Sequence, residues 1–150
     1  MSLTEHFDLA ELIRSDYAIR HDINNMPTDP EVANNLVTLA EGLERVRAVL
    51  GRPVIVTSGY RCEAVNRAIG GASNSDHMRG LAADFHVGGM SPYDVCRALL
   101  KHPDIGWSAL IYEGGWTHVA FPEDGHEPQR MVLTAHFTNG RATYTKGLEA

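Results

Sequence analysis

The stretch Ser75-Asp76-His77-Met78-Arg79-Gly80-Leu81-Ala82-Ala83-Asp84 passes from a polar loop into an apolar strand. The strand is predicted over residues 81–87 and ends at Gly88-Gly89. Asp84 stands inside it beside alanine and phenylalanine, where an unpaired carboxylate is costly to bury. His77 lies seven residues earlier, at the entry to the strand. An imidazole and a carboxylate in these places favour a bound cation.

The elements on either side of this stretch have recognisable boundaries. Asp29 is a typical N-cap and Pro30 a typical first residue of a helix, which then carries an apolar face as far as Gly51. The other predicted elements are one short helix capped by Asp8 and running to Tyr17, a strand over 54–58, a helical turn over 63–69, a helix beginning at Pro92, and strands over 109–113, 116–121, 131–137 and 142–144. Helices come first and hairpins later, so the predicted class is α+β, with helices packed on a small, mainly antiparallel sheet.

Length and composition limit the possible functions. A chain of 150 residues predicts a single domain over residues 1–150. The net charge is −6 and no basic stripe is present, so we expect no nucleic-acid partner. No apolar run approaches the roughly 20 residues of a membrane span. The first residues lack the basic and apolar regions of a signal peptide, which predicts a cytoplasmic protein as synthesised.

Cysteine and histidine usage bears on the kind of metal site. The two cysteines, Cys62 and Cys96, make no disulfide framework, and free thiols are expected although one bridge is possible. Neither has a CxxC partner, whereas the chain has eight histidines. A metal would therefore be held by imidazole and carboxylate groups.

A third metal ligand must come from outside the first stretch. His118, on the predicted strand over 116–121, is the candidate that would complete a set with His77 and Asp84. On spacing alone, a turn-capping aspartate and structural histidines remain the alternatives. His86 lies two residues beyond Asp84, and is predicted to be either a partner of the ligands or a partly buried structural histidine.

The Gly114-Gly115 hairpin places a second carboxylate near this set. A two-residue loop pairs Glu113 with Trp116 and Ile111 with His118, so their side chains share one face of the sheet. Glu113 would then stand diagonal to His118, where a general base for water on a metal belongs. An ordinary glutamate at the end of a hairpin is the alternative.

These motifs resemble the M15 peptidases, the zinc D-alanyl-D-alanine carboxypeptidases and L-alanyl-D-glutamate endopeptidases. The segment over 57–61 looks like the family's SGYR segment, and the one over 116–119 resembles its later WxH segment. The likeness spans roughly residues 3–121 and implies the fold of the zinc D-Ala-D-Ala carboxypeptidases, which is hedgehog-like. The metal motif SxHxxGxAxD is complete, in Ser75, His77, Gly80, Ala82 and Asp84.

The resemblance implies that His77, Asp84 and His118 bind Zn²⁺ and that Glu113 is the catalytic base. Many members place the acidic residue three positions before the histidine, where this chain has Gly115. Glu113 stands five positions before it, and the hairpin geometry makes the longer spacing workable.

Two further roles and the substrate are implied by the same likeness. Arg61 matches the arginine that polarises the scissile carbonyl or holds a substrate carboxylate, and Ser75 would hydrogen-bond the substrate. Zinc would lower the pKa of water, and Glu113 would take its proton and return it to the leaving amine.

The implied function is a zinc peptidase that cleaves the stem peptides of bacterial peptidoglycan, as a D,D-carboxypeptidase or an L-Ala–D-Glu endopeptidase. A phage or prophage endolysin, monomeric and released to the periplasm or cell wall, would suit such a chain. The alternative is a non-catalytic, zinc-containing binding module of the same fold, because the acidic residue is displaced.

Overall fold

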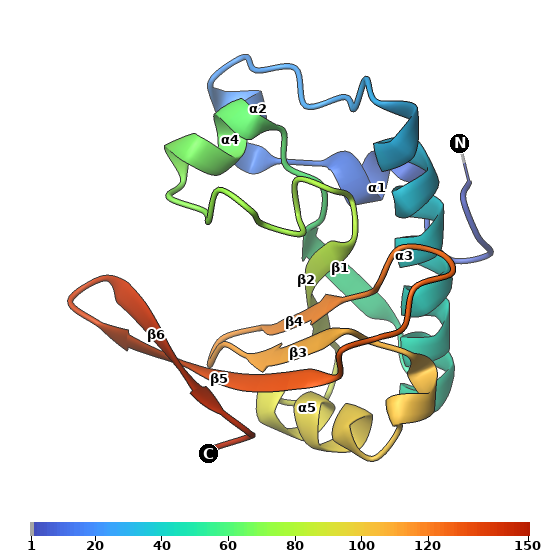
Figure 1. Ribbon diagram of the computed structural model, residues 1–150, viewed down its shortest axis with the longest axis vertical. Coiled ribbons are helices and arrows are strands. Elements are labelled where there is room, and N and C mark those ends of the chain that lie inside the picture. Colours follow the sequence, from blue (N-terminus) through green and yellow to red (C-terminus); the bar gives the residue numbers. More distant parts are fainter. Residues whose placement is uncertain (1) are drawn as a thin grey trace.

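A six-stranded sheet organises the computed structural model, which describes residues 2–150 (Figure 1). The strand order is β1-β2-β4-β3-β5-β6, and all neighbours run antiparallel except β3 and β5, which are parallel. The predicted α+β class with a mainly antiparallel sheet is confirmed. The strands are β1 (Val54–Ser58), β2 (Ala82–Val87), β3 (Ala109–Tyr112), β4 (Thr117–Ala120), β5 (Met131–Thr138) and β6 (Arg141–Lys146). The helices are α1 (Leu9–Ile13), α2 (Asp16–Arg20), α3 (Pro30–Leu50), α4 (Glu63–Ala68) and α5 (Pro92–Leu100), with a short 3-10 turn, η1 (Pro103–Ile105).

Helix α3 is the longest element and forms as its sequence predicts. The Asp29 carboxylate accepts a hydrogen bond from the backbone N–H of Glu31, and Pro30 is the first helical residue. Gly51 ends the helix in the left-handed conformation at φ +64°. The helix buries Leu36, Leu39, Leu43 and Val46, the predicted apolar face. Among residues 2–150, no helix has the length and apolar character that a membrane crossing requires.

The helix predicted from Asp8 to Tyr17 is wrong, because two helices form there. Asp8 caps α1, and the Ser15 hydroxyl accepts a hydrogen bond from the backbone N–H of Ala18 to begin α2. In the last turn of α1, the C=O of Leu12 accepts a hydrogen bond from the backbone N–H of Tyr60 at 2.7 Å. A local cap and a tertiary contact have replaced the helical hydrogen bonds.

The two faces of the sheet have different surroundings. Helix α5 packs on β2, β3 and β4 and also contacts α3. The core lies on that side of the sheet and includes Phe85, Leu110 and Val119, each at most 1% exposed. Side chains alternate along a strand, so Asp84, Ile111 and His118 point to the opposite face.

The β5–β6 hairpin extends the sheet beyond the helices and projects from the body of the molecule (Figure 1). The parallel pairing of β5 with β3 joins it to the sheet, with Ile111 beside Leu133. Every residue of β6 is exposed to solvent. The hairpin is therefore held mainly from one side.

Candidate metal centre

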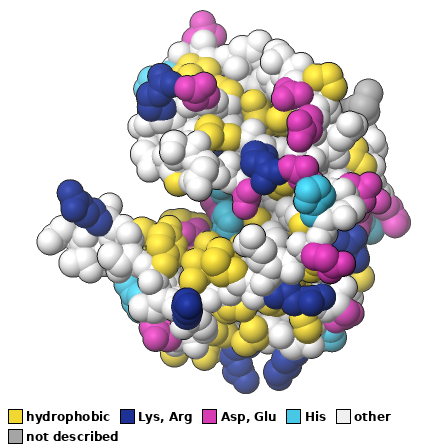
Figure 2. All heavy atoms as spheres, viewed as in Figure 1, with side chains coloured by type: hydrophobic (Ala, Val, Ile, Leu, Met, Phe, Trp, Pro, Cys, Tyr) yellow, Lys and Arg dark blue, Asp and Glu magenta, His cyan; other side chains and the backbone are white. Residues whose placement is uncertain are grey.

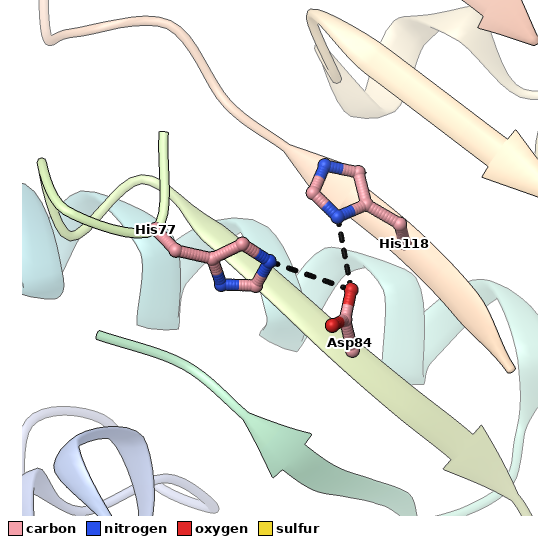
Figure 3. Close-up of side chains that lie close together, drawn as sticks. All are labelled: His77, Asp84 and His118. Carbon is pink, nitrogen blue, oxygen red and sulfur yellow. Dashed lines mark hydrogen bonds and ion pairs between the residues drawn. The ribbon is translucent and has the colours of Figure 1, made fainter. Parts of the chain in front are cut away.

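Three side chains from two strands and a loop meet on the open face of the sheet (Figure 3). Asp84 of β2 and His118 of β4 are register partners, and His118 Nδ1 lies 2.9 Å from Asp84 Oδ1. His77 reaches them from the loop before β2, with Nε2 at 3.5 Å from the same oxygen. One donor atom from each of the three side chains lies within 4.8 Å of the others. The arrangement can hold one metal ion.

A backbone contact orients His77. Its side chain is buried, and Nδ1 lies 2.7 Å from the C=O of Gly59. A carbonyl only accepts, so Nδ1 carries the proton and the lone pair of Nε2 faces Asp84. Gly59 is needed here because a Cβ would lie 2.3 Å from the C=O of Leu12. The close approach of α1 to residue 59 thus helps to place a metal donor.

The charge states of these side chains fit a cation. Burial lowers the pKa of His77 and keeps its imidazole neutral, although Asp84 opposes the effect. Burial raises the pKa of Asp84, but the hydrogen bond from His118 and the influence of the nearby His77 outweigh it and hold that pKa well below its usual range. A lone pair on Nε2 thus faces an ionised carboxylate at 3.5 Å, and a cation between them removes the repulsion. Two imidazoles and one carboxylate, with a position left for water, fit catalytic Zn²⁺.

The three side chains lie in a cleft of about 520 Å³. The loop over residues 69–76 forms one wall, and Met131 and Tyr144 of the β5–β6 hairpin line the other. Figure 2 shows the hollow between the part of the molecule that carries α4 and the hairpin. Glu113 and Arg61 also line this cleft.

Glu113 lies at the end of β3, beside the Gly114-Gly115 turn, in the predicted register with Ile111 opposite His118. Trp116 Nε1 donates a hydrogen bond to its carboxylate, which sets the orientation of the side chain. Burial raises the pKa of Glu113, and the negative charge of Asp84 raises it further, against smaller opposing effects. A half-buried carboxyl with a raised pKa suits the transfer of protons near neutral pH.

Arg61 and Ser75 are joined to the loop that carries His77. The Ser75 hydroxyl accepts hydrogen bonds from the backbone N–H of His77 at 3.2 Å and from Arg61 Nη2 at 3.4 Å. The backbone N–H of Arg61 donates to the C=O of His77 at 3.1 Å. Arg61 Nε is buried and has no hydrogen-bond partner within residues 2–150. Arg61 nevertheless lines the cleft, and the five N–H groups of its guanidinium exceed the single side-chain hydrogen bond that Nη2 donates to Ser75.

A family model described as Peptidase M15 matches residues 5–120, which is more than half of the chain. The chain belongs to the M15 peptidase family. A zinc D-Ala-D-Ala carboxypeptidase of Streptomyces albus G is 36% identical to this M15 peptidase over 94 residues. The match covers 59% of this chain and 35% of that protein, so the chain spans about a third of the length of its curated relative.

The interpretation of His86 changes in this family member. His86 is exposed, which excludes both the partner of a ligand and the partly buried structural histidine. It pairs with Ile55 of the outer strand β1, and Ile55 is itself 54% exposed, because the sheet is uncovered there. Cys62 and Cys96 are both free, as expected.

Met131 and Tyr144 also line the cleft, although no motif in the sequence pointed to them. Both predicted strands form, but the pairing of β5 with β3 brings them to the site. Alternation along the strands could have placed the two side chains on one face, whereas no local signal identifies β3 as the neighbour of β5.

Proposed function

We propose that this chain is a zinc-dependent peptidase that hydrolyses an amide bond in the stem peptides of bacterial peptidoglycan. The buried set of His77, Asp84 and His118, open to a cleft that also contains Glu113, carries the proposal. Residues 1–150 would act as a single domain. The name of the relative supports both the metal and the substrate class.

His77, Asp84 and His118 would hold Zn²⁺ through Nε2, a carboxylate oxygen and a ring nitrogen. When bound, zinc supplies a Lewis acid that lowers the pKa of water and polarises the carbonyl. The contact between His77 Nδ1 and the Gly59 carbonyl keeps the Nε2 donor in place before the metal arrives.

Glu113 is proposed as the general base and acid. Its carboxylate takes a proton from the attacking water and gives it to the nitrogen of the leaving amine as the amide bond breaks. The Trp116 indole bonds one carboxylate oxygen and leaves the other for this transfer. Its raised pKa brings the proton affinity of Glu113 closer to neutral pH.

Arg61 is proposed to bind the oxygen of the scissile carbonyl or a carboxylate of the substrate. Its place in the lining of the cleft and the forked geometry of guanidinium suit either oxygen group. Ser75 steadies this side chain through its hydroxyl and lines the cleft, where it would also contact the substrate.

The bond that is cleaved divides the proposal into two activities. A D,D-carboxypeptidase removes a terminal D-alanine, and the relative's name supports this one. An L-Ala–D-Glu endopeptidase cuts nearer the glycan, as an endolysin working at the cell wall would.

Mass spectrometry of defined muropeptides tests the proposal. Zinc-loaded protein should release a product whose mass identifies the bond, and chelated protein should release none. Glu113→Gln should keep zinc but slow the reaction by about 10²–10⁴-fold, the usual contribution of a general base. Glu127→Gln is the matched control, since Glu127 is exposed and is not a residue of the cleft.

Intact muropeptides after incubation with protein shown to hold zinc would contradict the peptidase. The binding module of the same fold would then replace it. Full activity of the Glu113→Gln variant would instead show that a group other than Glu113 is the general base.

A further inference from the structure

The β5–β6 hairpin leaves three large apolar side chains in solvent. Met131, Phe137 and Tyr144 are 44%, 53% and 51% exposed. Figure 2 shows hydrophobic side chains gathered on the side of the hairpin that faces the hollow. Solvent-exposed apolar groups clustered at a cleft indicate a surface that binds something.

Strand register places these side chains on the face of the metal centre. Ile111 is opposite His118 in the β3–β4 pair and beside Leu133 in the β3–β5 pair. Every second residue of β5 then shares that face, from Met131 to Phe137, and Tyr144 joins them because it pairs with Ala135. The metal centre and the apolar side of the hairpin thus form one continuous surface.

Past Val132, which packs against the core, the other face of the hairpin is polar, whereas the side toward the cleft carries one charge, Lys146, which pairs with Leu133. The polar face carries a histidine and hydroxyl side chains on alternating positions, namely Thr134, His136, Thr143 and Thr145. A hairpin with both faces in solvent would not need its apolar and polar side chains on opposite faces. The apolar residues therefore face the cleft for a reason that solvation alone does not supply.

Tyr144 belongs to the same cleft as the metal centre. With Met131 it lines the same cavity as His77, Asp84 and His118. Burial raises the pKa of the Tyr144 phenol, and the negative charges of Glu113 and Asp84 raise it further. The ring thus stands in the electric field of the site and stays neutral there.

The hairpin is anchored so that this wall keeps its shape. The rings of Phe137 and Trp116 lie 6.0 Å apart at 45°, which ties the hairpin to the β3–β4 turn. On the other face, the Thr134 hydroxyl donates to the C=O of Gly147 at 2.8 Å and accepts from the backbone N–H of Glu149 at 2.9 Å. All of the hairpin lies beyond residues 5–120, which match the family model.

The facing wall is more polar. It consists of the loop over residues 69–76, in which the exposed Ile69 is followed by Gly70, Gly71, Ala72 and polar side chains. Glycines leave backbone groups accessible, so this wall suits the amide groups of an extended peptide. The hairpin wall would then contact the aliphatic groups of the same substrate peptide.

We propose that Tyr144 and Met131 bind the methyl and methylene groups of the substrate peptide, and that this contact determines substrate affinity. The inference rests on the proposed function, because it needs a stem peptide in the cleft. Phe137 acts as a positioning residue that holds the wall through Trp116.

Steady-state kinetics on a purified disaccharide-pentapeptide test the wall. Tyr144→Ala should raise KM about tenfold with kcat within about twofold, since uniform binding is lost when an apolar contact of this size is removed. Tyr144→Phe should stay within about twofold of the unmodified protein, because the apolar ring remains. Thr143→Ala is the matched control, from the next residue of β6 on the opposite face.

Calorimetry on zinc-loaded Glu113→Gln protein measures the same contact without turnover. Adding Tyr144→Ala should weaken binding of the disaccharide-pentapeptide about tenfold. Equal Kd values with and without Tyr144→Ala would contradict the proposed role of Tyr144 in substrate binding. A loss of kcat with an unchanged KM would contradict it too. A Tyr144→Phe variant as impaired as Tyr144→Ala would overturn it in favour of hydrogen bonding by the hydroxyl.

The two measurements separate failure of the wall from failure of the proposed function. If the unmodified protein cleaves nothing but binds the muropeptide, the peptidase fails, and the calorimetric comparison still decides the role of Tyr144. If the unmodified protein cleaves the muropeptide and Tyr144→Ala changes neither KM nor Kd, only the proposed binding role of Tyr144 is contradicted. Circular dichroism of each variant checks that the hairpin is folded.

Discussion

The centre of the sheet and its outer hairpin break the usual rule of burial in opposite ways. At the centre, the side chains of Asp84 and His118 are only 14% exposed although they are polar. On the hairpin, Tyr144 and Phe137 are more than half exposed although they are aromatic. Both exceptions face the same cleft or support its wall.

The difference supports the role that we propose for each region. Buried polar groups must find partners, so the centre is held by hydrogen bonds that also prepare a cation site. Exposed apolar groups keep an unfavourable contact with water, which is relieved when a ligand covers them. The centre is therefore suited to chemistry and the hairpin to recognition.

The largest effect is expected from the metal donors. His118→Ala should lower zinc affinity by more than about 100-fold, since even the outer partners of metal ligands contribute about 10–100-fold. His86→Ala, on the same strand as Asp84 but exposed, should leave affinity unchanged. Competition with a chromophoric chelator measures both. Equal affinities would contradict the assignment of the centre.

Substitution of one phenylalanine in each region compares what the two regions contribute to the free energy of unfolding. Phe85→Ala removes a fully buried core ring and should cost about 3–5 kcal/mol of unfolding free energy. Phe137→Ala loses mainly its contact with Trp116 and should cost less than about 1.5 kcal/mol. Urea denaturation followed by circular dichroism gives both values. Similar costs would show that the hairpin belongs to the core.

A smaller effect is expected from Glu113 in zinc-free protein. Because the folded state raises its pKa, that state holds the proton more tightly, and stability falls as pH rises from the ordinary glutamate pKa through the raised one. Glu113→Gln removes this cost, so the variant should melt at a higher temperature at pH 7. The advantage should vanish below about pH 4, where an ordinary glutamate is also protonated. A variant that melts lower at pH 7 would contradict the raised pKa.

The smallest effect concerns the thiols. Burial raises the pKa of Cys96 to about 12, and its side chain is 1% exposed behind the sheet. Cys62 is partly exposed, so a thiol reagent at pH 8 should modify it in the folded protein and leave Cys96 intact. Mass spectrometry of tryptic peptides distinguishes them, and rapid modification of Cys96 would show that the region under β4 opens readily.

Much of the fold could be predicted because its signals are local. Asp29 and Pro30 begin α3, and Gly114-Gly115 closes a hairpin whose register follows from a two-residue loop. The prediction of one helix failed after Ile13, because the backbone N–H of Tyr60 donates to the C=O of Leu12 in the last turn of α1. That contact is made by a residue more than forty positions away, and no local pattern shows it.

The candidate site divides in the same way. The types and spacing of His77, Asp84 and His118 pointed to a metal, since a carboxylate in an apolar strand needs a cation. Sequence did not show that the Gly59 carbonyl orients His77, nor that Trp116 holds Glu113. These contacts depend on side-chain directions that packing sets.

The sequence by itself determined the local elements, the α+β class and the chemical character of the donors, because caps, turns and alternation act over a few residues. Only the tertiary structure decided which strands became neighbours. The pairing of β5 with β3 turned an exposed hairpin into a wall of the cleft, and the solvent-exposed end of β2 left His86 outside the site. Such choices follow from the burial of the whole core, to which residues distant in sequence contribute together.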